Sequence, residues 1–297
     1  MKSHYYLFAL LVLLMASLAC TLPWTPVEET SPSAENMVTE PLPPTEIPEP
    51  AAPTEHATQG SFVCGPGMAA ANAFSVEFCY PEQYTNGFMQ VRVPEYSPSE
   101  ELPPWGVHPE MIEITLTGYP VANEYHDPII RIYPVDDFVA LDPYIQTLVD
   151  DLGALLASGA TDPDSIPFVP MLNAAQMMQA QVTHLAFQDG KGMRFITQYG
   201  QAAMPISNDS AFYAFIGLTD DGAYLISATL PVNHPLFSDN IFTEPQEGWE
   251  DFVENFTTYI STMETNLRTQ TQESFFPNLS PLDEMMASFL IPPDAIP

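Results

Sequence analysis

The sequence predicts an α+β domain, in which a mostly antiparallel β-sheet carries two long helices and follows a disordered, proline-rich tether. Three observations predict this class. Two consecutive β-hairpins occupy Gln181–Val232, each with an Asp-Gly pair between runs rich in β-branched and aromatic residues. Two stretches, one after Asp142 and one from Trp249, carry apolar residues at helical spacing. Prolines and glutamates crowd the first 60 residues.

Residues 1–19 are predicted to be a lipoprotein signal peptide. Lys2 precedes an apolar run over Tyr5–Leu14, which is long enough for a secretory signal and shorter than a membrane span. The following Ser17-Leu-Ala-Cys20 resembles a bacterial lipobox, in which the cysteine becomes the first mature residue and carries diacylglycerol and an N-acyl chain. The resemblance implies acylation at Cys20, with palmitate as an example, and anchoring to the cell membrane. Cleavage by an ordinary signal peptidase is the alternative.

Residues 20–59 form the predicted tether. Thr21–Thr58 contains nine prolines, seven glutamates and no lysine or arginine. Such a segment cannot bury enough apolar surface to offset the entropy of ordering it. Proline-rich chains extend by about 3 Å per residue, so the tether would reach on the order of 100 Å. The remaining residues, 60–297, are predicted to be a single extracytoplasmic domain.

The predicted domain begins with two cysteines, Cys64 and Cys79. In an exported domain such a pair predicts a disulfide, worth about 3 kcal/mol for a loop of about 15 residues. Metal binding is the alternative, but the neighbouring sequence offers no further ligands. Phe74–Tyr80 is predicted to be a strand that Pro81 ends, with Gly87–Val93 as its partner.

The next predicted strands are Met111–Thr117 and Ile129–Tyr133. Asp142 and Pro143 then predict a helix start, with the aspartate as N-cap and proline in the first turn. Gly159 is the predicted C-cap. The apolar residues of this helix recur at helical spacing: Tyr144, Leu148, Leu152 and Leu155.

The two hairpins follow an irregular segment that leads into a strand near Gln176. Their turns are predicted at Asp189–Gly192 and Thr219–Gly222, because glycine supplies the positive φ that such turns need. In the strand after the first turn, Phe195 and Tyr199 share one face and Arg194 the other. This alternation is typical of a sheet with one buried face.

The C-terminal region predicts a loop over residues 233–247 and then two helices. The first begins at Trp249 and runs for about 20 residues, and a short one opens at Ser280. The order of all these elements resembles the antiparallel sandwich of the PsbP/Mog1 group. That resemblance implies the fold, and it suggests an accessory subunit of a membrane complex as one function.

A second resemblance covers Leu172–Pro235. This run contains Gln-Val-Thr-His-Leu-Ala-Phe-Gln-Asp-Gly and Leu-Pro-Val-Asn-His-Pro, and it resembles bacterial lipoproteins whose function is unassigned. The resemblance implies an extracytoplasmic location and the fold. It implies no activity.

The charge balance excludes several partners. The chain has 6 lysines and arginines against 38 aspartates and glutamates, a net charge of −32. Nucleic-acid binding requires cations that neutralise phosphates, so we expect no nucleic-acid partner, and electrostatic docking on anionic lipid is equally disfavoured. The composition predicts a soluble, self-repelling surface, with a surface that binds cations or a basic partner as the alternative.

No catalytic motif stands out in the sequence. It has no Gly-x-Ser-x-Gly and no His-Glu-x-x-His, its acidic pairs do not match a calcium loop, and nothing implies a metal or cofactor. Asp220-Asp221-Gly222 is explained by its turn. Paired carboxylates for glycoside hydrolysis remain open, because sequence does not reveal their separation in space.

Three residues are candidates for ligand binding: His184 within a strand, and Asn233 and His234 where the last hairpin meets a loop. A hydrogen-bonded structural role is the alternative for both histidines. Aromatic residues around the hairpins are predicted to pack under the helices, with a ligand groove as the alternative. The sequence therefore favours a non-enzymatic domain that binds a small molecule or a protein, over a hydrolase that uses carboxylates.

Overall fold

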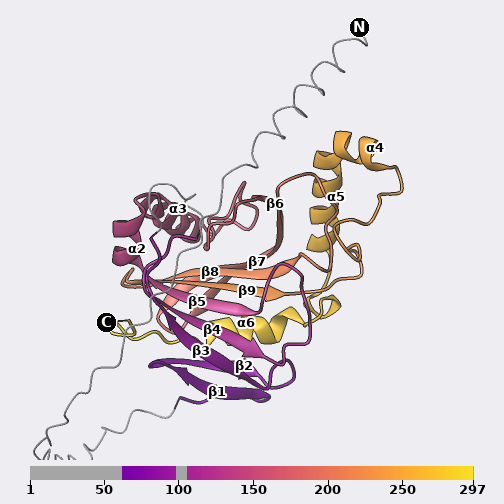
Figure 1. The fold of residues 1–297 in the computed structure, drawn as a ribbon. Coiled ribbons are helices and arrows are strands. Elements are labelled where there is room, and N and C mark those ends of the chain that lie inside the picture. Colours follow the sequence, from indigo (N-terminus) through magenta and orange to yellow (C-terminus); the bar gives the residue numbers. More distant parts are fainter. Residues whose placement is uncertain (1–61, 98–105, 297) are drawn as a thin grey trace, which may run out of the picture. The chain divides into compact units, whose positions relative to one another are not determined.

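Seven strands form one antiparallel sheet in the computed structural model, which describes residues 62–97 and 106–296 (Figure 1). The predicted signal peptide, Cys20 and the tether lie outside the described residues. The strand order is β3-β4-β5-β9-β8-β7-β6, and every neighbouring pair is antiparallel. The strands are β3 (Gly87–Val93), β4 (Met111–Thr117), β5 (Ile129–Pro134), β6 (Ala175–Phe187), β7 (Gly190–Gly200), β8 (Phe212–Thr219) and β9 (Tyr224–Pro231).

Helices accompany this sheet, so the predicted α+β class is confirmed. They are α2 (Val135–Leu141), α3 (Tyr144–Ser158), α4 (Trp249–Glu254), α5 (Phe256–Arg268) and α6 (Leu279–Ala287), with a short 3-10 helix at Gln272–Ser274. Within the described ranges, no helix is long and apolar enough to cross a membrane.

Both faces of the sheet are buried, whereas the alternation in the sequence predicted one. Helices α2 and α3 cover one face, where Phe195, Phe212 and Leu148 belong to one buried hydrophobic cluster. Helix α6 and a separate hairpin cover the other (Figure 1). The prediction was wrong because Arg194, which looked like a residue of a solvated face, is buried against α6.

The hairpin on the α6 side consists of β1 (Met68–Ala73) and β2 (Val76–Pro81). The predicted pairing of the Phe74–Tyr80 strand with Gly87–Val93 is therefore wrong, because β2 pairs with β1 and β3 pairs with β4. The β1–β2 turn uses positive φ at Phe74 and Ser75, 51° and 79°. Large residues rarely adopt that conformation, so the turn left no signal in the sequence.

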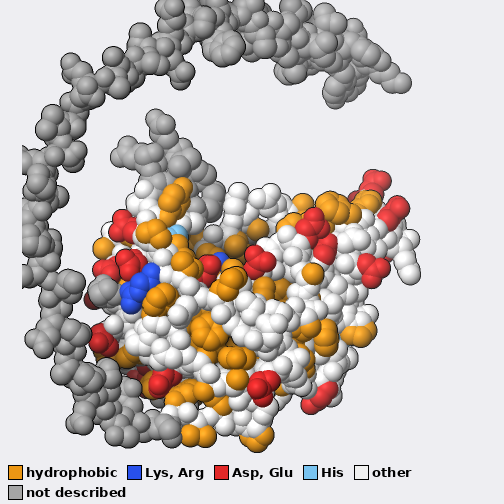
Figure 2. Space-filling view, turned by 60° about the horizontal axis from the view of Figure 1, so that its bottom comes forward, with side chains coloured by type: hydrophobic (Ala, Val, Ile, Leu, Met, Phe, Trp, Pro, Cys, Tyr) orange, Lys and Arg blue, Asp and Glu red, His pale blue; other side chains and the backbone are white. Residues whose placement is uncertain are grey.

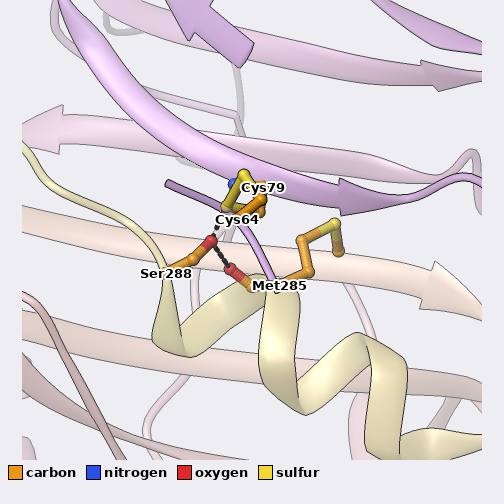
Figure 3. Close-up of a disulfide and its surroundings, with 4 residues drawn as sticks. All are labelled: Cys64, Cys79, Met285 and Ser288. Atoms are coloured by element: carbon orange, nitrogen blue, oxygen red, sulfur yellow. Dashed lines mark hydrogen bonds between the residues drawn. A yellow bond between two sulfur atoms is a disulfide. The ribbon is translucent and has the colours of Figure 1, made fainter. Parts of the chain in front are cut away.

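A disulfide joins Cys64 to Cys79, with 5.8 Å between their Cα atoms (Figure 3). The backbone N–H of Cys79 donates to the Ser288 hydroxyl at 2.8 Å, and this hydroxyl donates to the Met285 carbonyl at 2.6 Å (Figure 3). The disulfide thus fastens the chain ahead of β1 to β2, and Ser288 fastens β2 to the end of α6.

Helix α3 lies where it was predicted, but its N-cap is Pro143, one residue after the predicted Asp142. The Asp142 carboxylate accepts the N–H of Tyr144 at 3.0 Å, and Gly159 ends the helix at φ 67°. Pro134 ends β5, as predicted, but helix α2, which begins directly after it, was not predicted. Pro134 stands at the N-cap of α2 with φ −68°, a value that suits the start of a helix.

The long helix predicted from Trp249 is two helices, α4 and α5, which Asn255 separates. The Asn255 side-chain amide donates to the Asp251 carbonyl at 2.8 Å, and the residue leaves helical geometry at φ −101°, ψ 10°. Helix α5 then packs beside β6, where the N–H of Gln179 donates to the Glu264 carboxylate at 2.9 Å.

The first hairpin turns at Gln188 and Asp189, so the turn predicted at Asp189–Gly192 is displaced. Gly190 and Gly192 already belong to β7. A Cβ atom at Gly192 would lie 2.3 Å from the Phe215 ring, so glycine is required there by close packing. The second turn is as predicted, with Gly222 at φ 74°.

Candidate functional site

A groove lies at one end of the sheet, on the side that carries α3. It consists of two adjoining hollows of about 380 and 450 Å³, which share Leu172 and Tyr199 in their walls. Four connections line the smaller hollow: the loop after β4, the segment before β6, the loop after β7 and, through Ile241, the loop after β9. We call the two hollows together the aromatic groove, because Tyr125, His126 and Tyr199 contribute to the walls.

A stack of rings supports the aromatic groove. The His126 ring lies 4.4 Å from the Phe212 ring, and the Tyr199 ring lies nearly parallel to Phe212 at 6.1 Å. Asn123 holds the His126 loop in place. Its side-chain oxygen accepts the N–H of His126 at 3.0 Å, and its side-chain nitrogen donates to the Ala211 carbonyl at 3.2 Å. The loop after β4 is therefore fixed to the start of β8.

Polar groups sit at the rim of the aromatic groove. The Gln201 side chain donates to the Asn173 carbonyl at 2.7 Å, which ties the loop after β7 to the segment before β6. The Gln176 amide donates to the Tyr199 hydroxyl at 3.1 Å. Among the residues that the structure describes, no hydrogen bond is made by the His126 ring. This ring can therefore offer a donor and an acceptor to a ligand.

No charged residue lines the smaller hollow of the aromatic groove, although the chain carries 38 carboxylates. Burial lowers the pKa of His126 to about 4; the nearby Arg131 lowers this pKa further and Asp127 opposes the shift. The imidazole is therefore neutral at pH 7. The hollow combines apolar walls with a few neutral hydrogen-bonding groups, which is typical of small-molecule sites.

A second, acidic cleft of about 640 Å³ lies at the opposite ends of β7 and β8, by the two hairpin turns. Five carboxylates line it: Glu77, Asp189, Asp220, Asp221 and Asp294. One oxygen of Asp189 accepts the N–H of Ile291 at 3.0 Å, and the other is buried without a partner among the described residues. Burial raises the pKa of Asp189, Asp221 and Asp220 add to this, and the Ile291 N–H counteracts it.

Among the other carboxylates of the acidic cleft, Asp221 has a structural role. Asp221 holds its turn by accepting the Thr219 hydroxyl at 2.7 Å and the N–H of Ala223 at 3.0 Å. These bonds agree with the turn role predicted for the Asp-Asp-Gly run. In the described part of the chain, no three His, Cys, Asp or Glu side chains come close enough together to hold a metal ion.

His184 lies on β6, and its Nε2 is 2.8 Å from the carbonyl of Ala160, just after α3. For His184 the alternative to ligand binding was a structural role as a hydrogen-bonded histidine on a sheet face. The contact with Ala160 agrees with this alternative. His184 lines neither the aromatic groove nor the acidic cleft.

His234 is also held by protein groups, with 3% of its surface exposed. Its Nδ1 accepts the N–H of Leu236 at 3.1 Å, so Nε2 carries the proton and donates to the Ser274 hydroxyl at 3.0 Å. Asn233 exchanges backbone hydrogen bonds with Phe276. Asn233 and His234 also line neither the aromatic groove nor the acidic cleft, so the three candidates from the sequence do not form one site.

The sequence reasoning missed Tyr125, His126 and Gln201. Tyr125 and His126 belong to the loop after β4 and Gln201 to the loop after β7. The strand order brings these two loops together, so no local spacing connects them. The one available signal was the density of aromatic residues around the hairpins, for which a ligand groove had been the alternative.

Comparison with known proteins adds little. No protein-family model matches the sequence, and no curated protein matches it. Among solved structures, the chain is similar to the solution structure of cyanobacterial PsbP (CyanoP) from Synechocystis sp. PCC 6803. The match has 10% identity, covers 74% of this chain and 97% of that one, and reaches a TM-score of 0.24. The resemblance to PsbP expected from element order is therefore weak, and nothing further rests on it.

Proposed function

We propose that this chain is a membrane-anchored extracytoplasmic lipoprotein whose domain binds a neutral ligand in the aromatic groove, without catalysis. The anchor rests on the signal sequence and on Cys20 within its lipobox-like motif. The domain would stand away from the membrane on the proline-rich tether. The ligand would be a neutral molecule with an apolar ring, recognised by Tyr125 and Tyr199.

The uncharged lining carries this proposal. Acidic side chains are spread over the face of the molecule shown in Figure 2, yet none lines the smaller hollow. At a net charge of −32, the surrounding field repels an anion. A buried cation would need a partner charge, which the smaller hollow lacks; Asp151 lines only the larger one. A neutral ligand avoids both costs, and the rings and the His126 nitrogens supply its contacts.

Nile red tests the proposal, because this dye is neutral and planar and fluoresces more strongly in apolar surroundings. We expect saturable binding to the purified chain. Tyr125→Ala should weaken it about fivefold or more, since one stacked aromatic contact contributes about 1–3 kcal/mol. The matched control is Tyr96→Ala, because Tyr96 is as exposed as Tyr125, at 47%, and lines neither the groove nor the cleft.

The anionic dye 1-anilinonaphthalene-8-sulfonate supplies the comparison of charge. It is similarly apolar, so a groove that selects neutral ligands should bind it much more weakly than Nile red. Equal loss of Nile red binding in the Tyr125 and Tyr96 variants would exclude the aromatic groove as the site. Native mass spectrometry of protein isolated from its own cells would then identify any molecule that travels with the fold.

A hydrolase that uses carboxylates is a second candidate function, which the raised pKa of Asp189 in the acidic cleft favours. The pKa of Asp189 is raised and that of Asp221 is lowered by the Ala223 N–H and the Thr219 hydroxyl, so Asp189 is the carboxyl that could serve as a general acid. A panel of fluorogenic glycosides tests this candidate. Turnover that Asp189→Asn abolishes would support it, and turnover that survives this substitution would exclude the cleft.

A further inference from the structure

The two edges of the seven-stranded sheet differ in their protection. Helix α5 packs along the β6 edge, where Gln179 and Gln181 bond to it. At the other edge, β3 pairs only with β4, and within residues 62–97 and 106–296 no backbone hydrogen bond reaches its outer side. An open edge presents unpaired N–H and C=O groups to another chain.

Strand β3 is regular and apolar. Its pairing with β4 runs without a bulge from Gly87 to Val93. Met89 and Val91 project from the face where Val93 joins the α3 core, and they are 62% and 48% exposed. Proteins usually protect an edge with a bulge, a proline or a lysine, and β3 contains none of these.

Charge indicates what pairs with this edge. Gly87–Val93 contains no aspartate or glutamate, although the chain carries 38, so two copies of β3 can approach without direct carboxylate repulsion. Its single cation, Arg92, is turned toward the Ala295 carbonyl at 3.0 Å and Glu110 at 3.4 Å. An acidic peptide would gain little there, because that charge is already used.

We propose that β3 pairs antiparallel with the β3 of a second copy of this chain, about a two-fold axis at Gln90. This register places Met89 opposite the partner's Val91 on one face, and Val91 opposite the partner's Met89. The same surface serves both copies, as a closed two-fold dimer requires. The two sheets then form one continuous sheet, and both exposed apolar side chains become covered.

Salt dependence follows from the charge of each copy. Two molecules of net charge −32 repel one another outside the carboxylate-free strand. Raising the salt from about 0.01 M to about 1 M shortens the Debye length from about 30 Å to about 3 Å. The dimer fraction should therefore rise with salt, whereas an interface built from ion pairs would weaken.

Gln90→Cys in the full chain tests the register. Opposed residues of an antiparallel pair have Cα atoms about 4.5–5.5 Å apart, within the range of a disulfide. Mild oxidation should convert most of this variant to a covalent dimer. Gln188 is also an exposed glutamine, and Gln188→Cys should remain monomeric. The unsubstituted chain, oxidised in the same way, measures any cross-linking through Cys20.

Sedimentation velocity completes the test. The parent chain should show twice the monomer mass at high salt, and Val91→Lys, which places a charge on the edge, should return it to the monomer mass. Two results would overturn the proposal. One is a parent chain that stays monomeric at every salt concentration, and the other is no more cross-linking for Gln90→Cys than for Gln188→Cys.

Discussion

Arg194 and Asp283 form a buried bidentate ion pair that joins β7 to α6. The Arg194 Nε and Nη2 atoms donate to the two Asp283 oxygens at 3.1 and 2.9 Å, and the arginine is fully buried. Asp283 also accepts the Tyr213 hydroxyl at 3.0 Å and the Gln272 amide at 3.2 Å. One carboxylate thus organises the polar groups between the sheet and the C-terminal helix.

We expect Asp283→Asn to lower the free energy of unfolding by about 3–5 kcal/mol, because it leaves the Arg194 charge buried without its partner. Asp162→Asn is the control, since its pair with Arg268 is exposed and should contribute less than about 1 kcal/mol. Urea unfolding measures both. A double variant, Arg194→Met with Asp283→Leu, should be more stable than Asp283→Asn; equal stability would show that the buried charge is not the cause.

Reduction of the Cys64–Cys79 disulfide should lower the free energy of unfolding by about 2–4 kcal/mol, because the bridge restricts the unfolded chain over a separation of 15 residues. Urea unfolding with and without dithiothreitol measures the change. Ser288→Ala leaves the disulfide intact, removes the hydroxyl's bonds to Cys79 and Met285, and should cost about 1–3 kcal/mol. Coincident unfolding curves in the two conditions would exclude a stabilising bridge.

Acidification should destabilise the fold through His126. Its pKa is about 4 in the folded protein and 6.5 ordinarily, so between these values the unfolded chain binds a proton that the folded chain does not. Stability should therefore fall as pH drops from about 6.5 to about 4, by up to about 3 kcal/mol. His126→Gln should flatten this slope in urea unfolding. A His126 ring that titrates near 6.5 in NMR spectra would contradict the expectation.

Cys20→Ser should release the protein from the membrane. Each buried methylene of an acyl chain contributes about 0.8 kcal/mol to membrane binding, so loss of the acylated cysteine removes the anchor. Fractionation should place the parent chain in the detergent-soluble membrane fraction and the variant in the supernatant. Mass spectrometry of the N-terminal peptide checks the acyl groups directly, and an unmodified Cys20 in the parent would refute lipidation.

Local signals explain what could be predicted from the sequence. Helix α3 carried its own start and stop in Asp142 and Gly159, and the second hairpin carried Gly222 in its turn. The β1–β2 hairpin escaped prediction because Phe74 and Ser75 adopt positive φ without glycine or asparagine. Prediction of one-sided burial failed at Arg194, whose partner is 89 residues away.

The candidate site was less accessible than the fold. His126 and Gln201 line the same hollow only because β4 and β7 end where β8 begins, at one end of the sheet. No single segment of the sequence encodes that strand order. The residues that could be singled out by type, His184 and His234, have protein partners for their ring nitrogens.

The disulfide also determines how the domain would bear mechanical load. Without the disulfide, a force on the chain ahead of Cys64 would act on the first residue of β1. It would break the hydrogen bonds between β1 and β2 one at a time. Cys79 diverts that pull into the middle of β2, and Ser288 passes it on to α6. Strand β1 would then carry little of the load, and tension along the proposed tether would reach the core without separating β1 from β2.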